Sequence, residues 1–131
     1  MITPCIHFNG NCDEAIKFYK SVLSAEVKEI FYAKDAPPDS GMEGLPPNFV
    51  MHSNVLINGL TMGLSDGSEV PVPFGTFSFL IQYETEEEVR STFGKLEVGG
   101  KAEEPLAAVF WSPLYGSVID KFGVNWQVMK A

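Results

Sequence analysis

The sequence predicts an α+β fold made of two βαβββ modules, and two repeated observations lead to this prediction. Each half opens with an apolar stretch of strand character followed by a helix start, and each half ends with a glycine turn followed by an alternating stretch. We expect one domain over residues 1–131, with modules at 1–66 and 74–131 joined by a linker at 67–73. Two such modules can form a curved mixed sheet with both helices on its convex face, which leaves the concave face free for a ligand.

The first module begins with a predicted strand at Ile2–Phe8 and a predicted helix at Cys12–Leu23. Asn11 followed by Glu14 has the pattern of a capping box, and the apolar residues behind it recur at helical spacing. The alternating segment Glu26–Tyr32 should return as a strand.

A proline-rich loop follows at residues 35–48, which contain four prolines and two glycines. Loops of this length often border binding sites, and a tolerated surface insertion is the alternative. Strands at Phe49–Ile57 and Leu60–Ser65 should then form a hairpin across Asn58-Gly59, a strong hairpin signal.

The second module repeats the order, with a strand at Phe74–Tyr83 and a helix at Glu86–Val98. Thr85 and Glu88 form its capping box, and Gly99-Gly100 ends the helix. The remaining strands are expected at Lys101–Trp111, Leu114–Ile119 and Val124–Met129.

Composition narrows the classes of function. The formal net charge of −8 disfavours nucleic-acid binding, which needs a basic surface. No apolar run approaches the roughly 20 residues of a membrane span, and the N-terminus lacks the features of a signal peptide. The two cysteines, Cys5 and Cys12, have no His or Cys cluster beside them. We therefore expect a cytoplasmic protein with no membrane or nucleic-acid partner.

Two sequence motifs resemble those of the vicinal oxygen chelate superfamily, which includes glyoxalase I, bleomycin and fosfomycin resistance proteins and extradiol dioxygenases. The segment Ala15–Leu23, with its Phe18-Tyr19 pair, is similar to the first-helix signature, and Asp120–Trp126 is similar to the Asp-Pro-Phe-Gly ending. The segments Ile2-Thr3-Pro4, Phe8–Cys12, Ala36-Pro37-Pro38, Val50-Met51-His52 and Phe110-Trp111 more narrowly resemble the PhnB-like branch. That branch often carries the label 3-demethylubiquinone-9 3-methyltransferase. We do not expect that activity, because the sequence has no glycine-rich loop of the kind that cradles S-adenosylmethionine.

The resemblance also implies where a metal would be held. Superfamily enzymes usually bind one divalent metal with His or Glu from four strands. The equivalent positions here are Pro4, Gly63, Ser78 and Gln127. None is an imidazole or a carboxylate, the donors that zinc and harder ions require. We expect no metal and no other cofactor.

Strand alternation predicts which side chains line the concave face instead. The predicted ligand-binding residues are Ile6, Phe8, Thr61, Ser78, Gln82, Trp111, Asn125 and Gln127. His7 is out of phase with Ile6 and Phe8 and should face the helix. Phe110, Trp111 and Tyr115 are aromatic candidates for stacking on a ligand, for a dimer contact or for the core.

These inferences favour a homodimer that binds a small organic molecule without a metal. The alternative is an enzyme of the same superfamily with an atypical site, in which His52, Tyr115 or Cys12 supplies proton transfer or nucleophilic chemistry. A third possibility is a structural or regulatory dimer with a collapsed cleft.

Overall fold

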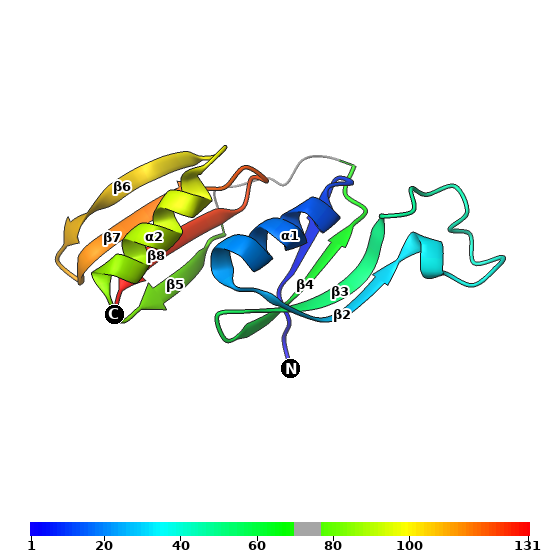
Figure 1. The fold of residues 1–131 in the computed structure, drawn as a ribbon, viewed down its shortest axis with the longest axis horizontal. Helices are drawn as coiled ribbons and strands as arrows, with labels where there is room; N and C mark the ends of the chain where they lie inside the picture. The colour runs from blue at the N-terminus through cyan, green and yellow to red at the C-terminus, as the bar shows by residue number, and fades with distance from the viewer. Residues whose placement is uncertain (70–76) are drawn as a thin grey trace. The chain divides into compact units, whose positions relative to one another are not determined.

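The computed structural model describes residues 1–69 and 77–131. The chain divides into two compact units, Met1–Val72 and Pro73–Ala131. In each unit a single helix covers one face of a four-stranded sheet (Figure 1). We call the opposite face of each sheet its open face. Part of the predicted linker at 67–73 and the start of the predicted strand at 74–83 lie outside the described residues.

Unit 1 has the predicted order of elements. These are β1 (Cys5–Phe8), α1 (Cys12–Leu23), β2 (Glu26–Tyr32), the short 3-10 helix η1 (Ala33–Asp35), β3 (Val50–Ile57) and β4 (Leu60–Asp66). The strands lie in the order β1-β4-β3-β2. β1 is parallel to β4, and the other pairs are antiparallel.

Unit 2 repeats this arrangement. Its elements are β5 (Phe79–Tyr83), α2 (Glu86–Glu97), β6 (Lys101–Val109), β7 (Ser112–Ile119) and β8 (Asn125–Lys130). The order is β5-β8-β7-β6, with β5 parallel to β8 and the other pairs antiparallel. The predicted fold class, an α+β fold of two βαβββ modules, is therefore confirmed. Among the described residues, neither twelve-residue helix has the length and apolar character to cross a bilayer.

The two helices begin differently. The capping box of α2 is confirmed, since Thr85 Oγ1 accepts a hydrogen bond from the Glu88 backbone N–H and donates one to the Glu88 carboxylate. The capping box of α1 is wrong, because the Asn11 side chain makes no cap hydrogen bond. Asp66 at the end of β4 takes that role, and its Oδ1 accepts from the Cys12 N–H at 3.0 Å.

The core of each unit lies between the sheet and its helix. Met62 and Leu64 of β4, and Trp126 and Val128 of β8, are at most 1% exposed, as their alternation predicts. Phe77 was also expected beneath α2, but it precedes β5 and is 84% exposed.

The predicted facing of the first strand is wrong. Phe8 is fully buried, and Ile6 lies beside the buried Leu64 in parallel register, so both belong to the core face. His7 lies beside Ser65 on the open face. The alternation was counted from Pro4, which precedes β1 and does not share its pleat. Ile6 and Phe8 are therefore not on the face that we predicted for the ligand.

Candidate functional site

Three of the predicted site residues form a continuous hydrogen-bonded chain on the open face of unit 2. The Tyr115 hydroxyl of β7 donates to Gln127 Oε1 of β8 at 2.9 Å. Gln127 Nε2 in turn donates to Ser78 Oγ at 2.6 Å, just before β5. Because an amide oxygen only accepts and an amide nitrogen only donates, the direction of this chain is fixed. The Ser78 hydroxyl, having accepted from Gln127, can donate its own proton to a further acceptor.

The donor end of this hydrogen-bonded chain is Tyr115, whose hydroxyl keeps its proton. Tyr115 is 7% exposed, and burial, together with the Glu104 carboxylate, raises the pKa of its hydroxyl. At neutral pH the hydroxyl is therefore a hydrogen-bond donor, and its proton is shared with Gln127. This argues against Tyr115 as a general base, the role considered for it from the sequence.

Aromatic side chains continue the site from Tyr115. The Trp111 ring meets the Tyr115 ring edge to face, with centroids 5.4 Å apart, and Phe110 meets Trp111 at 4.7 Å. Trp111 is 53% exposed and Phe110 is 96% exposed, since both lie in the β6–β7 turn. The open face of unit 2 thus joins uncharged polar groups to accessible aromatic surface.

Two further predicted residues lie on the same strands. Gln82 is exposed on β5 and pairs with Met129 of β8. Asn125 pairs with Ile119, and its Oδ1 is buried without a hydrogen-bond partner in the part of the chain that the structure describes. Buried amide oxygens are normally paired, so this unpaired acceptor is an exception within the described residues.

The open face of unit 1 carries different chemistry. His7 Nδ1 lies 2.9 Å from Ser65 Oγ, and Asn54 Nδ2 donates to Glu29 Oε2 at 3.1 Å. His52 Nε2 is 4.0 Å from the same Glu29 oxygen. Thr61, the predicted site residue on β4, is exposed and pairs with Leu56. The sequence interpretation placed His7 on the helix side because it reversed the phase of β1, whereas the structure places it on the open face, on which His52 of β3 also lies.

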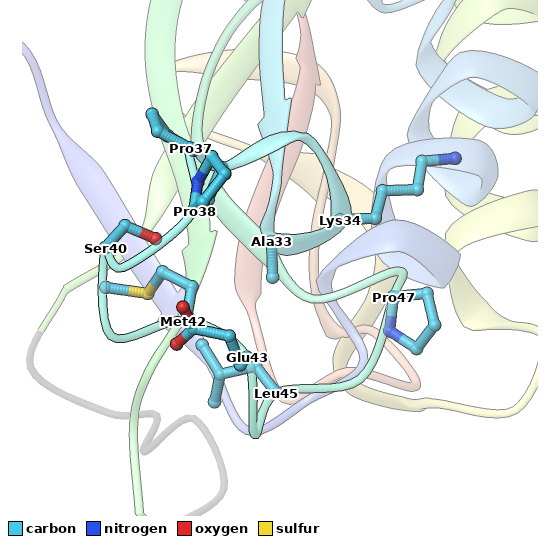
Figure 2. A pocket seen from close by; sticks show the side chains of 10 residues that line it. Ala33, Lys34, Pro37, Pro38, Ser40, Met42, Glu43, Leu45 and Pro47 are labelled. Atoms are coloured by element: carbon cyan, nitrogen blue, oxygen red, sulfur yellow. The ribbon is translucent and has the colours of Figure 1, made fainter.

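His52 also borders a hollow under the proline-rich loop. This hollow, which we call the loop hollow, has a volume of about 520 Å³. It is lined by Phe31, Tyr32, Asp35, Ala36, Pro37, Ser40, Met51 and His52. A second hollow of about 370 Å³ lies within the loop itself, where Pro37, Ser40, Met42 and Leu45 surround the position of Ala33 (Figure 2). That the proline-rich loop borders a binding site stays a prediction, and Phe31 and Met51 were not among the residues predicted for it.

Cys12 does not fit a nucleophilic role. Its side chain is fully buried at the start of α1. Burial and the carboxylates of Asp66 and Asp13 raise the pKa of its thiol well above the usual range. The thiolate is therefore not formed at neutral pH.

The positions that correspond to metal ligands in related enzymes lie in adjacent pairs. In unit 1 the Pro4 carbonyl accepts from the Gly63 N–H at 2.9 Å. In unit 2 the Ser78 and Gln127 side chains are hydrogen-bonded. Proline and glycine offer no side-chain donor, and a hydroxyl and an amide are weak ligands for zinc or harder divalent ions. Among residues 1–69 and 77–131, no group of three His, Cys, Asp or Glu side chains is placed to hold a metal. These residues do not fit the metal that the fold implies.

Two βαβββ units in one chain are the fold plan of a class of protein, the vicinal oxygen chelate superfamily. The chain belongs to the family described as 3-demethylubiquinone-9 3-methyltransferase, whose model matches residues 1–129. It is 30% identical to Protein YjdN of Escherichia coli (strain K12), over 97% of this chain and 92% of that protein. These matches confirm membership of the PhnB-like branch.

Solved structures support the same fold. A putative 3-demethylubiquinone-9 3-methyltransferase, PhnB protein, from Bacillus cereus superposes with a TM-score of 0.83 at 29% identity, covering 99% of this chain and 98% of that chain. The fosfomycin resistance protein FosX from Listeria monocytogenes superposes with a TM-score of 0.67 at 13% identity, covering 100% of this chain and 92% of that chain. At that identity the second likeness shows the fold alone.

Proposed function

We propose that the protein binds a small organic molecule on the open faces of its sheets and does so without a metal. The observation that carries this proposal is the hydrogen-bonded chain from Tyr115 through Gln127 to Ser78. One end of it presents the Ser78 hydroxyl as an uncharged donor, and at the other end Tyr115 lies against the accessible ring of Trp111. Small-molecule sites combine such fixed polar groups with aromatic walls. In unit 2, Gln82 and Asn125 belong to the proposed ligand-contacting set, and in unit 1 we propose Thr61 as a ligand contact on that unit's own open face.

Metal independence is supported by the donor chemistry of the chain. FosX has been solved with Mn(II) and sulfate bound. In this chain the corresponding positions are Pro4, Gly63, Ser78 and Gln127, which supply no carboxylate or imidazole. We do not extend the methyl transfer named in the family description to this chain, because its sequence has no glycine-rich cofactor loop.

Three further parts of the proposal concern the oligomeric state, the location and the domain organisation of the protein. We propose a homodimer, since the exposed Phe110, Trp111 and Phe77 of unit 2 are the kind of aromatic surface found at interfaces. We also propose a cytoplasmic location for the protein, in keeping with its two free cysteines, Cys5 and Cys12. One continuous domain over residues 1–131 completes the proposal.

The test is a thermal-shift screen in EDTA with uncharged aromatic compounds that carry hydrogen-bond acceptors, followed by ligand-observed NMR of the hits. We expect stabilising hits that chelation leaves unchanged. Gln127→Leu and Ser78→Leu should abolish binding, whereas Ser91→Leu, at an exposed position of α2, should not. Retention of binding in both site variants, or hits that require an added divalent ion, would overturn the proposal.

A further inference from the structure

The loop hollow of unit 1 has the size and the walls of a binding pocket. Its volume of about 520 Å³ lies within the range of small-molecule sites, roughly 300–1,000 Å³. Two adjacent strands supply its floor, because Phe31 at the end of β2 pairs directly with His52 near the start of β3. Loop residues 35–40 supply the opposite wall.

The floor is a pair of flat rings. The Phe31 and His52 rings stack with their centroids 6.2 Å apart and an angle of 27° between their planes. Phe31 is nevertheless 49% exposed, so a large part of its ring faces the hollow and solvent. A flat ligand ring laid on this surface would remove apolar area from water and add ring contacts. Met51 and Pro37 extend the apolar walls around it.

The charged side chains around the hollow indicate which charge a bound ligand can carry. The Asp35 carboxylate is in the lining, and Glu29 Oε2 lies 4.0 Å from His52 Nε2. The Lys34 ammonium lies over the Tyr32 ring, with Nζ 5.1 Å from the centroid. The lining itself includes the Asp35 carboxylate and no lysine or arginine, which disfavours an anionic ligand.

The loop that forms the outer wall is held by its own turns. Backbone hydrogen bonds run from Ala36 N to Ala33 O and from Ser40 N to Pro37 O, and Asp39 N donates to the Glu43 carboxylate. Ala36, Pro37 and Ser40 line both hollows of the loop, and Figure 2 shows Pro37 and Ser40 at the smaller one. Because these residues border both hollows, one layer of the loop separates the two. The loop's own hydrogen bonds hold the shape of this wall.

We propose that the loop hollow is a subsite for a flat, uncharged or cationic aromatic group, which stacks on Phe31 and receives a hydrogen bond from, or gives one to, His52. This inference deepens the proposed function by naming the class of ligand, but it depends on unit 1 residues alone. Its failure is therefore distinguishable from failure of the test at Ser78 and Gln127.

The experiment uses two probes that differ by one charged group. N-Phenyl-1-naphthylamine is uncharged, and 8-anilino-1-naphthalenesulfonate is its sulfonated analogue. Each is titrated into the purified full chain, with binding read from probe fluorescence. Phe31→Thr removes the stacking surface and keeps strand propensity at an exposed position. Ser40→Trp fills the hollow from the loop wall. Leu60→Thr is the matched control, since Leu60 is an exposed apolar strand residue of unit 1 that does not line the hollow.

We expect the uncharged probe to bind and the sulfonated probe to bind at least about tenfold more weakly. Phe31→Thr and Ser40→Trp should each weaken the uncharged probe about tenfold, whereas Leu60→Thr should leave it unchanged. Thermal melting of each variant checks that the fold is retained. Two results would overturn the inference: probe binding that both unit 1 variants retain while they stay folded, or tighter binding of the sulfonated probe. In the NMR spectrum, the His52 ring resonances should shift when the uncharged probe is added, and their failure to move would count equally against it.

Discussion

Gln127 Nε2 donates a hydrogen bond to Ser78 Oγ at 2.6 Å, which joins β8 to the residue just before β5. The same amide accepts from Tyr115, so one side chain links β7, β8 and the residue before β5. Gln127 therefore orders an uncharged polar surface. Its amide gives that surface a fixed donor direction, which a carboxylate in the same place would not have.

We predict that Gln127→Leu destabilises the protein by about 1–3 kcal/mol, because it removes the acceptor of the nearly buried Tyr115 hydroxyl. Gln127→Glu should retain most of the stability, since both hydroxyls can donate to its carboxylate oxygens. Urea denaturation followed by circular dichroism measures the difference. Equal losses in the two variants would contradict a role for the hydrogen-bonded chain.

A second prediction concerns Asp120, which is 3% exposed and organises the turn before β8. Its Oδ1 accepts from the backbone N–H groups of Phe122 and Val124, and its Oδ2 accepts from Trp126 Nε1 at 2.8 Å. Asp120→Ala leaves these buried donors unpaired, and we expect a loss of about 3 kcal/mol or more in the free energy of unfolding.

Asp120→Asn should lower the free energy of unfolding by an intermediate amount. Its amide oxygen can still accept a hydrogen bond, whereas its amide nitrogen cannot accept and faces another donor. The unfolding transition can be followed by Trp126 fluorescence in a Trp111→Phe background, with the exposed Glu97→Ala as the control. If Asp120→Ala unfolds at the same urea concentration as the control, the turn does not depend on this carboxylate.

A third prediction separates the two cysteines. Cys5 is exposed, whereas Cys12 is buried, and burial with the Asp66 and Asp13 carboxylates raises the pKa of the Cys12 thiol. Iodoacetamide at about pH 8 should modify Cys5 in the folded protein and reach Cys12 only in denaturant. Mass spectrometry of wild type and of Cys5→Ser reports this directly. Rapid modification of folded Cys5→Ser would restore Cys12 as a candidate nucleophile.

Most of the fold could be predicted because its signals are local. The α2 capping box at Thr85, the Asn58-Gly59 turn and the alternation of Trp126 and Val128 each depend on residues within a few positions of one another. The helix start at Cys12 was predicted at the right place for an incorrect reason. Its cap comes from Asp66, 54 positions away, and no local pattern reports such a contact.

Less of the candidate site than of the fold could be predicted from the sequence. Ser78, Gln127 and Tyr115 were each named, but their hydrogen-bonded order follows from strand register. His7 was placed on the wrong face because β1 has only four residues, and a short strand carries little phase information. Phe31 was not named at all. Its position in the predicted strand gives no sign of a binding role. Its place beside His52 follows only from the pairing of β2 with β3.

The last prediction concerns the contact between β2 and α1. The Tyr32 hydroxyl donates to Asp13 Oδ1 at 2.6 Å, and Lys17 pairs with the other Asp13 oxygen at 2.9 Å. The hydrogen bond to Asp13, reinforced by burial, raises the pKa of Tyr32 to about 12. Burial raises the pKa of Asp13, but the Tyr32 and Lys17 hydrogen bonds outweigh it, and the net change is a lowering.

These shifts fix the sign of the pH dependence. The folded state favours protonated Tyr32, so this contribution to stability is full below about pH 10 and is lost as the pH rises through about 12. We expect Tyr32→Phe to be less stable than wild type by about 1 kcal/mol at neutral pH. The gap should close between about pH 10 and 12, and absorbance titration should lose its highest tyrosine transition. A gap that stays constant through alkaline pH would show that the contact stabilises the fold by packing alone.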